Sequence, residues 1–287
     1  MDRARTRMNI MRNRRGGLWA LLLGAAILNG PVPAQAAGND FEPHVGQEGK
    51  NVVWVPTSEA LADKMLSLAK VTAADYVIDL GSGDGRIVIA AAKLGARALG
   101  VEYNADMVEL AKRNAAKEGV SDRARFMKAD LFDVDLSRAT VVTMFLLPSL
   151  NVRLRPALLE LEPGTRIVSN TFTMGEWTAD ESAEAGDSKY YHTALLWIVP
   201  ANVEGTWETS AGELVLRQDF QTVTGTLRSG GGLLPVEKGR LRGDQISFSA
   251  GGAHYTGRVV SRTTMEGTVT GGSPDNWSAV RPGKRVD

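Results

Sequence analysis

Residues 77 to 87 read VIDLGSGDGRI, and this stretch decides the fold. An apolar strand ends in Asp79 and is followed at once by glycines at positions 81, 83 and 85. Glycine lets the backbone turn sharply and approach a ligand closely, because no Cβ stands in the way. Residues 86 to 94 have the pattern of a helix, whose first N–H groups and positive dipole end would face that ligand. Strand, glycine-rich turn and helix together predict the first unit of a nucleotide-binding α/β sheet.

The acid at the end of this strand indicates which nucleotide is bound. In the dinucleotide fingerprint G-x-G-x-x-G a pyrophosphate lies at the helix N-terminus, and a carboxylate beside it would repel it. Here the spacing is G-x-G-x-G, and Asp79 stands just before it. Such a pocket suits a ligand that has no phosphate and at least one positive group. S-adenosylmethionine (SAM), with its α-ammonium and sulfonium, meets both conditions.

Two more acids follow at predicted strand ends. Residues 96 to 103 contain Glu102, which lies about 20 residues past the loop, where an acid accepts hydrogen bonds from ribose hydroxyls. Residues 124 to 133 place Asp130 after a third strand, in position to accept from an adenine amino group. Each acid alone is also compatible with a strand-end cap or a surface position, and the glycines with a tight turn. In their common order, however, they resemble class I SAM-dependent methyltransferases.

The rest of the first 200 residues has the pattern of an α/β sheet covered by helices. We expect helices at residues 58 to 70, 104 to 119 and 148 to 164, and further strands at 140 to 146, 165 to 172 and 190 to 199. Thr57 or Ser58 is suited to cap the first helix, and Pro156 should kink or restart the third. The acidic segment between the last two strands predicts a mobile surface loop. One antiparallel strand therefore follows the fifth strand, where this class usually has two.

A narrower resemblance rests on VPTSEALADKML before DLGSGDGRIVIAAAK, and on an apolar strand that leads into LLPSLN. Together these motifs are similar to a group of seven-strand protein lysine methyltransferases. Its members include mitochondrial enzymes that act on the c-ring protein of ATP synthase and on the adenine nucleotide carrier, with bacterial relatives. The match covers about residues 50 to 175. The resemblance implies transfer of a methyl group from SAM to an acceptor, most simply a protein lysine amine.

The resemblance also implies roles for particular residues. Asp79 and the loop would hold the methionine end of SAM, Glu102 the ribose, and Thr57 would close over the cofactor. The implied cofactor-binding set is Thr57, Asp79, Gly81, Ser82, Gly83, Asp84, Gly85, Glu102, Asp130 and Leu131, with the last two at the adenine, and the implied acceptor channel is Leu146, Leu147 and Pro148. An activated sulfonium mainly needs alignment with its acceptor and exclusion of water. No catalytic base and no metal are therefore assigned.

Several aromatic residues are candidates for the channel wall, although core packing is the first interpretation for each. These are Trp54, Phe145, Phe172, Trp177 and Tyr191. His192 is a candidate base or an ordinary strand residue. No Asn-Pro-Pro-Tyr or Asp-Pro-Pro-Tyr follows the fourth strand, which argues against a planar base or a glutamine amide as the acceptor.

Charge is unevenly distributed along the chain. The first 15 residues hold six arginines and one aspartate, and removing them from 33 basic and 33 acidic residues leaves 27 against 32, a net charge of −5. No basic groove is expected, which argues against a nucleic acid partner. The chain contains no cysteine, which excludes a thiol nucleophile and a cysteine-ligated zinc.

The N-terminus has the composition of a targeting segment. The basic start is followed by LWALLLGAAIL at residues 18 to 28 and by Ala34-Gln35-Ala36. This order predicts a bacterial secretory signal peptide or an uncleaved N-terminal anchor within residues 1 to 36. The apolar run is shorter than the roughly 20 residues that a membrane span needs. The protein is expected to be periplasmic or anchored at the membrane, with a protein substrate at or near that membrane, or cytoplasmic if the start site is misassigned.

Residues 203 to 287 have a different character from the methyltransferase region at 50 to 200. Short alternating runs are separated by glycines and threonines, which predicts an antiparallel barrel or sandwich. The segment opens with Gly205-Thr206-Trp207 and ends with Trp277 and Arg281. This resembles lipocalin-like barrels, in which the arginine stacks across the tryptophan. So short a barrel has little interior volume, and we expect it to dock a substrate protein or a wall surface.

Two hypotheses follow. The first is an active methyltransferase whose β module aids recognition. The second is a non-catalytic exported binding protein that retains the methyltransferase fold. The acids at 79, 102 and 130 favour the first, and the predicted leader favours the second.

Overall fold

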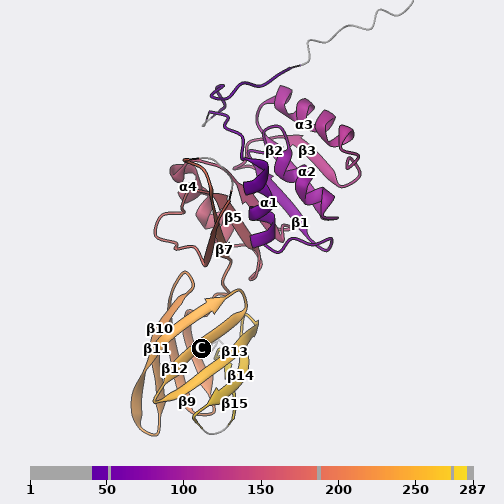
Figure 1. Cartoon of the computed structure of the whole chain (residues 1–287). Helices are drawn as coiled ribbons and strands as arrows, with labels where there is room; N and C mark the ends of the chain where they lie inside the picture. Colours follow the sequence, from indigo (N-terminus) through magenta and orange to yellow (C-terminus); the bar gives the residue numbers. More distant parts are fainter. Residues whose placement is uncertain (1–40, 51–52, 186–188, 273–274, 283–287) are drawn as a thin grey trace, which may run out of the picture. The chain divides into compact units, whose positions relative to one another are not determined.

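The computed structural model describes residues 41–50, 53–185, 189–272 and 275–282. They form an α/β part built on a seven-stranded sheet and an antiparallel barrel (Figure 1). The predicted leader at residues 1 to 36 lies outside the described residues and stays a prediction. Within the described residues, no helix has the length and apolar character that crossing a membrane requires.

The central sheet has the strand order β3-β2-β1-β4-β5-β7-β6. Its strands are β1 Tyr76–Leu80, β2 Arg97–Glu102, β3 Ala124–Lys128, β4 Val141–Met144, β5 Arg166–Asn170, β6 Glu181–Glu184 and β7 Thr193–Ile198. The first five strands are parallel, while β7 and β6 are antiparallel. The chain winds outward from β1 in both directions, so the loops at the carboxyl ends of β1 and β4 flank the point where ligands bind in such sheets.

Four helices cover the two faces of this sheet. They are α1 Glu59–Leu68, α2 Arg86–Lys93, α3 Ala105–Lys117 and α4 Pro148–Leu159. Side chains alternate along a strand, and β1 shows the result: Val77 packs with α1 and α2 in one apolar cluster, whereas Ile78 packs with α4 in another. Ser58 caps α1 by accepting a hydrogen bond from the Leu61 N–H. The α/β fold predicted from the sequence is confirmed.

The segment after β5 differs from the prediction of a mobile loop. It contains strand β6, which pairs antiparallel with β7 from Glu181↔Leu196 to Glu184↔Thr193. Both antiparallel strands of the class are therefore present. The prediction failed because β6 has the sequence ESAE, which lacks the apolar and β-branched residues of a typical strand. As an edge strand it is half exposed, so its polar residues are tolerated.

Helix α4 also differs from the prediction. Pro156 lies inside one continuous helix that ends at Leu159, so the expected restart does not occur. Pro148 occupies the first turn of this helix, where the missing N–H costs nothing. Leu154 and Leu158 are buried against the sheet, and this packing offsets the hydrogen bond that Pro156 cannot donate.

The C-terminal module is a closed antiparallel barrel rather than a sandwich. Its strands are β8 Gly205–Thr209, β9 Gly212–Asp219, β10 Thr222–Ser229, β11 Gly232–Arg242, β12 Gln245–Ala250, β13 Ala253–Ser261, β14 Thr264–Thr270 and β15 Asn276–Val280. Pairing of β15 with β8 closes it. The guanidinium carbon of Arg281 lies 4.3 Å from the Trp207 ring centroid, as the lipocalin resemblance implied. Buried side chains fill the interior, and a cavity there measures about 30 Å³.

Candidate cofactor and acceptor site

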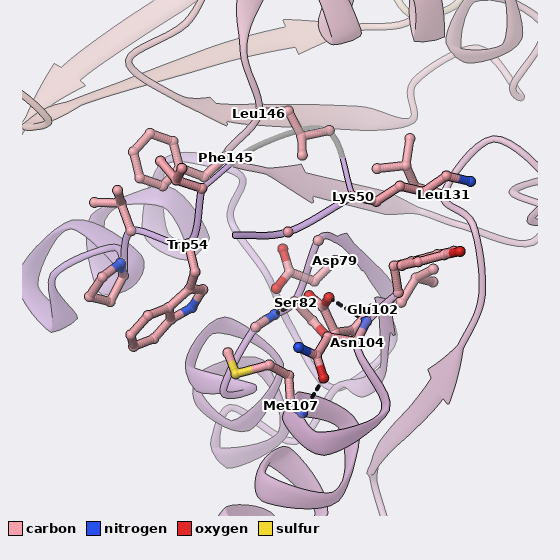
Figure 2. Close-up of a pocket in the computed structure, with 18 of the residues that line it drawn as sticks. Lys50, Trp54, Asp79, Ser82, Glu102, Asn104, Met107, Leu131, Phe145 and Leu146 are labelled. Carbon is pink, nitrogen blue, oxygen red and sulfur yellow. Dashed lines mark hydrogen bonds between the residues drawn. The ribbon is translucent and has the colours of Figure 1, made fainter. Parts of the chain in front are cut away.

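A pocket of about 400 Å³ opens at the carboxyl ends of β1, β2, β3 and β4. Its walls come from the glycine loop, from the segment 53–57 and from the residues that follow these strands. In Figure 2, Asp79, Ser82 and Glu102 lie near its centre, with Trp54 and Phe145 to one side and Lys50 and Leu131 to the other. Parallel strands thus bring together side chains that are far apart in the sequence.

The glycine loop has the backbone geometry that its sequence predicts. Gly81 and Gly83 have φ angles of 78° and 53°, in the left-handed region that side chains disfavour. The N–H groups of Gly81 and Ser82 both donate to the Val101 carbonyl, at 2.9 and 3.0 Å, and tie the loop to β2. A Cβ at Gly83 would lie 2.6 Å from Trp54 Nε1. This position therefore needs glycine for both conformation and space.

Glu102, at the end of β2, is fixed by two backbone donors. Its Oε2 accepts from the Gly83 N–H at 3.0 Å, and its Oε1 accepts from the Asn104 N–H at 2.9 Å. Asn104 in turn caps α3 by accepting from the N–H groups of Asp106 and Met107. The carboxylate is thus held at the pocket wall in one orientation, and its remaining lone pairs are able to accept from a ligand hydroxyl.

Asp79 is buried at the base of the pocket. Among the described residues, the Thr143 hydroxyl donates to its Oδ1 at 2.7 Å. Burial raises the pKa of Asp79 to about 7, and the neighbouring carboxylates of Glu102 and Asp84 add to the rise. A carboxylate that is buried among other acids favours a cationic ligand, because the ligand's charge compensates its own.

Asp130 lies on the other side of the pocket, after β3. Its Oδ2 is 2.5 Å from Lys50 Nζ, and its Oδ1 accepts from the Phe132 N–H at 3.0 Å. The hydrogen bond with Lys50 holds the pKa of the Asp130 carboxyl below its ordinary value. Lys50 Nζ also lies 4.6 Å from the centroid of the Tyr103 ring. Leu131, next to Asp130, contributes an apolar wall beside these groups.

Three aromatic rings cluster at another wall of the same pocket. The ring centroids of Phe145 and Tyr191 are 5.1 Å apart, those of Phe145 and Phe172 are 5.9 Å apart, and those of Phe172 and Tyr191 are 6.0 Å apart. Leu146 and Leu147 line the pocket next to them. We call Phe145, Phe172 and Tyr191 the aromatic trio. It forms an apolar surface with π faces beside the glycine loop.

The structure corrects the first interpretation of the aromatic residues. The aromatic trio and Trp54 all line the pocket, so they are not simply core residues. Trp177 is a core residue as expected: it is fully buried, and its carbonyl accepts from Trp197 Nε1 at 2.7 Å. The sequence alone gave no reason to separate the two groups, because the trio comes from three segments.

Three predicted residues lie outside the pocket wall. A Cβ at Gly85 would lie 2.7 Å from the Phe126 ring and 2.9 Å from the Ala111 methyl group, so this glycine serves the close packing of α2. Pro148 starts α4, and Leu150 lines the pocket in its place. His192 precedes β7, where its carbonyl accepts from the Ala185 N–H. The remaining predicted site residues do line the pocket: Thr57, Asp79, Gly81, Ser82, Gly83, Asp84, Glu102, Asp130, Leu131, Leu146 and Leu147.

This donor set fits SAM. Asp79 is buried and faces acids rather than a cation, which suits the α-ammonium and sulfonium of the methionine end. Gly83 leaves no room for a Cβ and permits close backbone approach. When bound, SAM supplies an activated methyl group on a positive sulfur. The residues of this chain have to bind and orient it and keep water away.

Comparison with known proteins agrees with this geometry. The family model described as the ANTKMT methyltransferase domain matches residues 79–181. A protein-lysine N-methyltransferase of Saccharolobus islandicus (strain REY15A) is 45% identical over 152 residues, which cover 52% of this chain and 94% of that protein. A lysine N-methyltransferase of Rattus norvegicus that is named for ATP synthase is 40% identical over 111 residues, or 38% of this chain and about half (51%) of that enzyme.

A solved structure is similar as well. The RNA methyltransferase from Salinibacter ruber, in complex with S-adenosyl-L-homocysteine, is 47% identical and has a TM-score of 0.49 over 52% of this chain and 96% of its own. The Saccharolobus islandicus relative is matched over nearly its whole length at 45% identity. The chain therefore belongs to the family of SAM-dependent methyltransferases that includes this relative and carries the ANTKMT methyltransferase domain.

Proposed function

We propose that this methyltransferase transfers the methyl group of SAM to the ε-amine of a lysine in a protein substrate. The observation that carries the proposal is the aromatic trio, which lines the same pocket as Asp79 and the glycine loop. An acceptor that enters past the trio would meet aromatic faces and leucine side chains rather than polar groups. The Saccharolobus islandicus and rat relatives are named for lysine methylation, which supports the same acceptor.

The trio suits a lysine amine in two ways. Lysine has to lose its proton before it attacks the methyl group, and an apolar channel lowers its pKa because burial penalises the charged form. The aromatic faces attract the ammonium as it arrives and stabilise a methylated ammonium afterwards through cation–π contact. The wall therefore favours entry of the cation and loss of its proton without a dedicated base.

The charge of the pocket argues against a phosphodiester acceptor. The acids in its wall are Glu48, Asp79, Asp84, Glu102 and Asp130, and the bases are Lys50 and Arg86. Both bases are already paired with acids of the wall, Lys50 with Asp130 and Arg86 with Asp84. The remaining acids make the pocket negative, which attracts cationic ligands and repels phosphates. RNA, the acceptor named for the Salinibacter ruber enzyme, is the alternative to test.

Location is the second part of the proposal. We propose that residues 1 to 36 export the chain or anchor it, so that its protein substrate lies at or near a membrane. The composition of this segment supports the idea, since a basic start precedes an apolar run. A reporter fused after Ala37 tests it: activity in the periplasm supports export, whereas cytoplasmic activity points to a misassigned start. Because SAM is made in the cytoplasm, the same result decides how the cofactor reaches the site.

The acceptor is tested by labelling a lysate with the purified protein and SAM that carries a deuterated methyl group. Membrane, soluble protein and RNA fractions are then analysed by mass spectrometry. We expect heavy methyl groups on lysine residues, absent when Asp79→Asn protein is used. Label that is confined to RNA would overturn the lysine proposal. No label in any fraction, although SAM binds, would favour the non-catalytic binding protein instead.

A further inference from the structure

Arg86 occupies an unusual place for a cation. It is the first residue of α2, where the positive end of the helix dipole disfavours a positive side chain. The neighbouring acid resolves this conflict, because Arg86 Nε lies 3.0 Å from Asp84 Oδ1 and Nη2 lies 2.6 Å from Asp84 Oδ2. Such two-point pairing fixes the plane of the guanidinium. The side chain is therefore pre-oriented by the glycine loop itself.

The third nitrogen of the guanidinium reaches a distant segment. Arg86 Nη1 donates to the Thr57 carbonyl at 2.6 Å, across 29 positions of sequence. Thr57 is buried, and its hydroxyl accepts from Asn170 Nδ2, at the end of β5, at 3.1 Å. Thr57 is thus held at two atoms by two different elements. A buried carbonyl that bonds to a charged donor is expensive to leave unpaired.

These contacts form one continuous series around the pocket. The Asp84 carbonyl accepts from Asn114 Nδ2 of α3 at 2.9 Å, which anchors the loop end of the series. From there it passes through Arg86 and Thr57 to Asn170. Thr57, Asp84 and Arg86 all line the pocket. Arg86 is the link in this series between the glycine loop and the segment 53–58.

We propose that Arg86 is a positioning residue for the cofactor: it fastens the segment 53–58 to the glycine loop through the Thr57 carbonyl and so holds the pocket in its SAM-binding shape. Its three nitrogens each have a protein partner, which favours this role over direct contact with the α-carboxylate of SAM. The inference concerns cofactor binding alone. Its test needs no acceptor and is therefore independent of the lysine proposal.

The experiment compares two ligands on matched variants. SAM and decarboxylated SAM are titrated by calorimetry into the wild-type protein, Arg86→Gln, Arg86→Lys and Asp84→Asn. Arg113→Gln, which alters an exposed arginine of α3, is the control. We expect Arg86→Gln to weaken both ligands equally, by about tenfold, as for loss of a hydrogen bond from a charged donor. Arg86→Lys should lose less, because an ammonium still reaches one carbonyl, and Asp84→Asn should follow the same pattern.

Hydrogen exchange gives a second readout. Faster amide exchange at residues 53–58 of Arg86→Gln, with an unchanged melting temperature of the ligand-free protein, is the expected signature of a released segment. A loss confined to SAM, with full affinity for the decarboxylated ligand, would assign Arg86 to the carboxylate and overturn the proposal. Unchanged affinity in both Arg86 variants would overturn it too. If Arg86→Gln fails to fold, the lysine and Asp84 variants give the same comparison.

Discussion

Replacing Asp79 by asparagine should make the ligand-free protein more stable while it abolishes SAM binding. The side chain is buried, and the Thr143 hydroxyl that donates to the carboxylate has an oxygen to donate to in asparagine as well. The substitution therefore keeps the shape and removes the charge. It separates the cost of the carboxylate in the fold from its use in the pocket.

The magnitude follows from the pKa of Asp79. Burial raises it to about 7 from an ordinary value of 3.8. In the pH range between these two values the unfolded chain has lost the proton that the folded chain keeps, so stability falls as pH rises through the range. Each pH unit of difference corresponds to about 1.4 kcal/mol, which amounts to about 4 kcal/mol at pH 8 and about 2 kcal/mol at pH 5. Asparagine has no such dependence.

The assay is urea unfolding of the ligand-free protein from about pH 5 to about pH 8, together with calorimetry of SAM binding. We expect the free energy of unfolding of Asp79→Asn to exceed that of the wild type by a margin that grows by about 2 to 3 kcal/mol over this range. SAM affinity should fall about 100-fold, as for loss of a charged partner. In the wild type, affinity should rise with pH through about 7, because the cation needs the ionised carboxylate.

Asp63→Asn is the matched control, since Asp63 is an exposed aspartate of α1. Its stability margin should stay flat with pH. Parallel pH curves for Asp79→Asn and the wild type would show that the carboxylate is not strained in the fold. Full SAM affinity in Asp79→Asn would show that the pocket does not use its charge. Either result would refute the reasoning above.

Three further substitutions test other parts of the molecule. Phe172→Leu should lower kcat/KM for the acceptor by about 3- to 30-fold, the scale of a cation–π contact, without changing SAM affinity; an equal loss for SAM would contradict an acceptor wall. Gly83→Ala should weaken SAM binding at least about tenfold, because its Cβ would lie 2.6 Å from Trp54 Nε1 at a positive φ, and calorimetry measures it. Arg281→Ala should destabilise the barrel by about 2 kcal/mol in urea unfolding, since it loses the contact with Trp207 and two hydrogen bonds to backbone carbonyls; SAM affinity should not change.

The parallel core of the sheet was predictable because its signals are local. Asp79 and Glu102 each end an apolar run, and parallel strands place such ends at one edge of the sheet. Spacing along the chain was therefore enough to bring them into one pocket. The barrel was predictable for a similar reason, since alternation and turn residues repeat along its strands.

The acceptor wall was not predictable because its signals are non-local. Phe145, Phe172 and Tyr191 lie after β4, after β5 and before β7, and they meet because these three strands are neighbours. The strand order has to be known before the rings can be grouped. Lys50 shows the same limit, since its partner Asp130 lies 80 positions away.

The acids of the glycine loop differ in how their charge is compensated, and this difference identifies the ligand site. Asp84 is paired with Arg86 and lies at the rim. Asp79 is deeper, and among the described residues it has the Thr143 hydroxyl as a donor but no salt-bridge partner. Arg86 is committed to Asp84 and to the Thr57 carbonyl, so it does not neutralise Asp79. A buried carboxylate whose charge the protein leaves uncompensated lowers stability. Its presence is explained by a ligand that brings the missing positive charge, as the methionine end of SAM does.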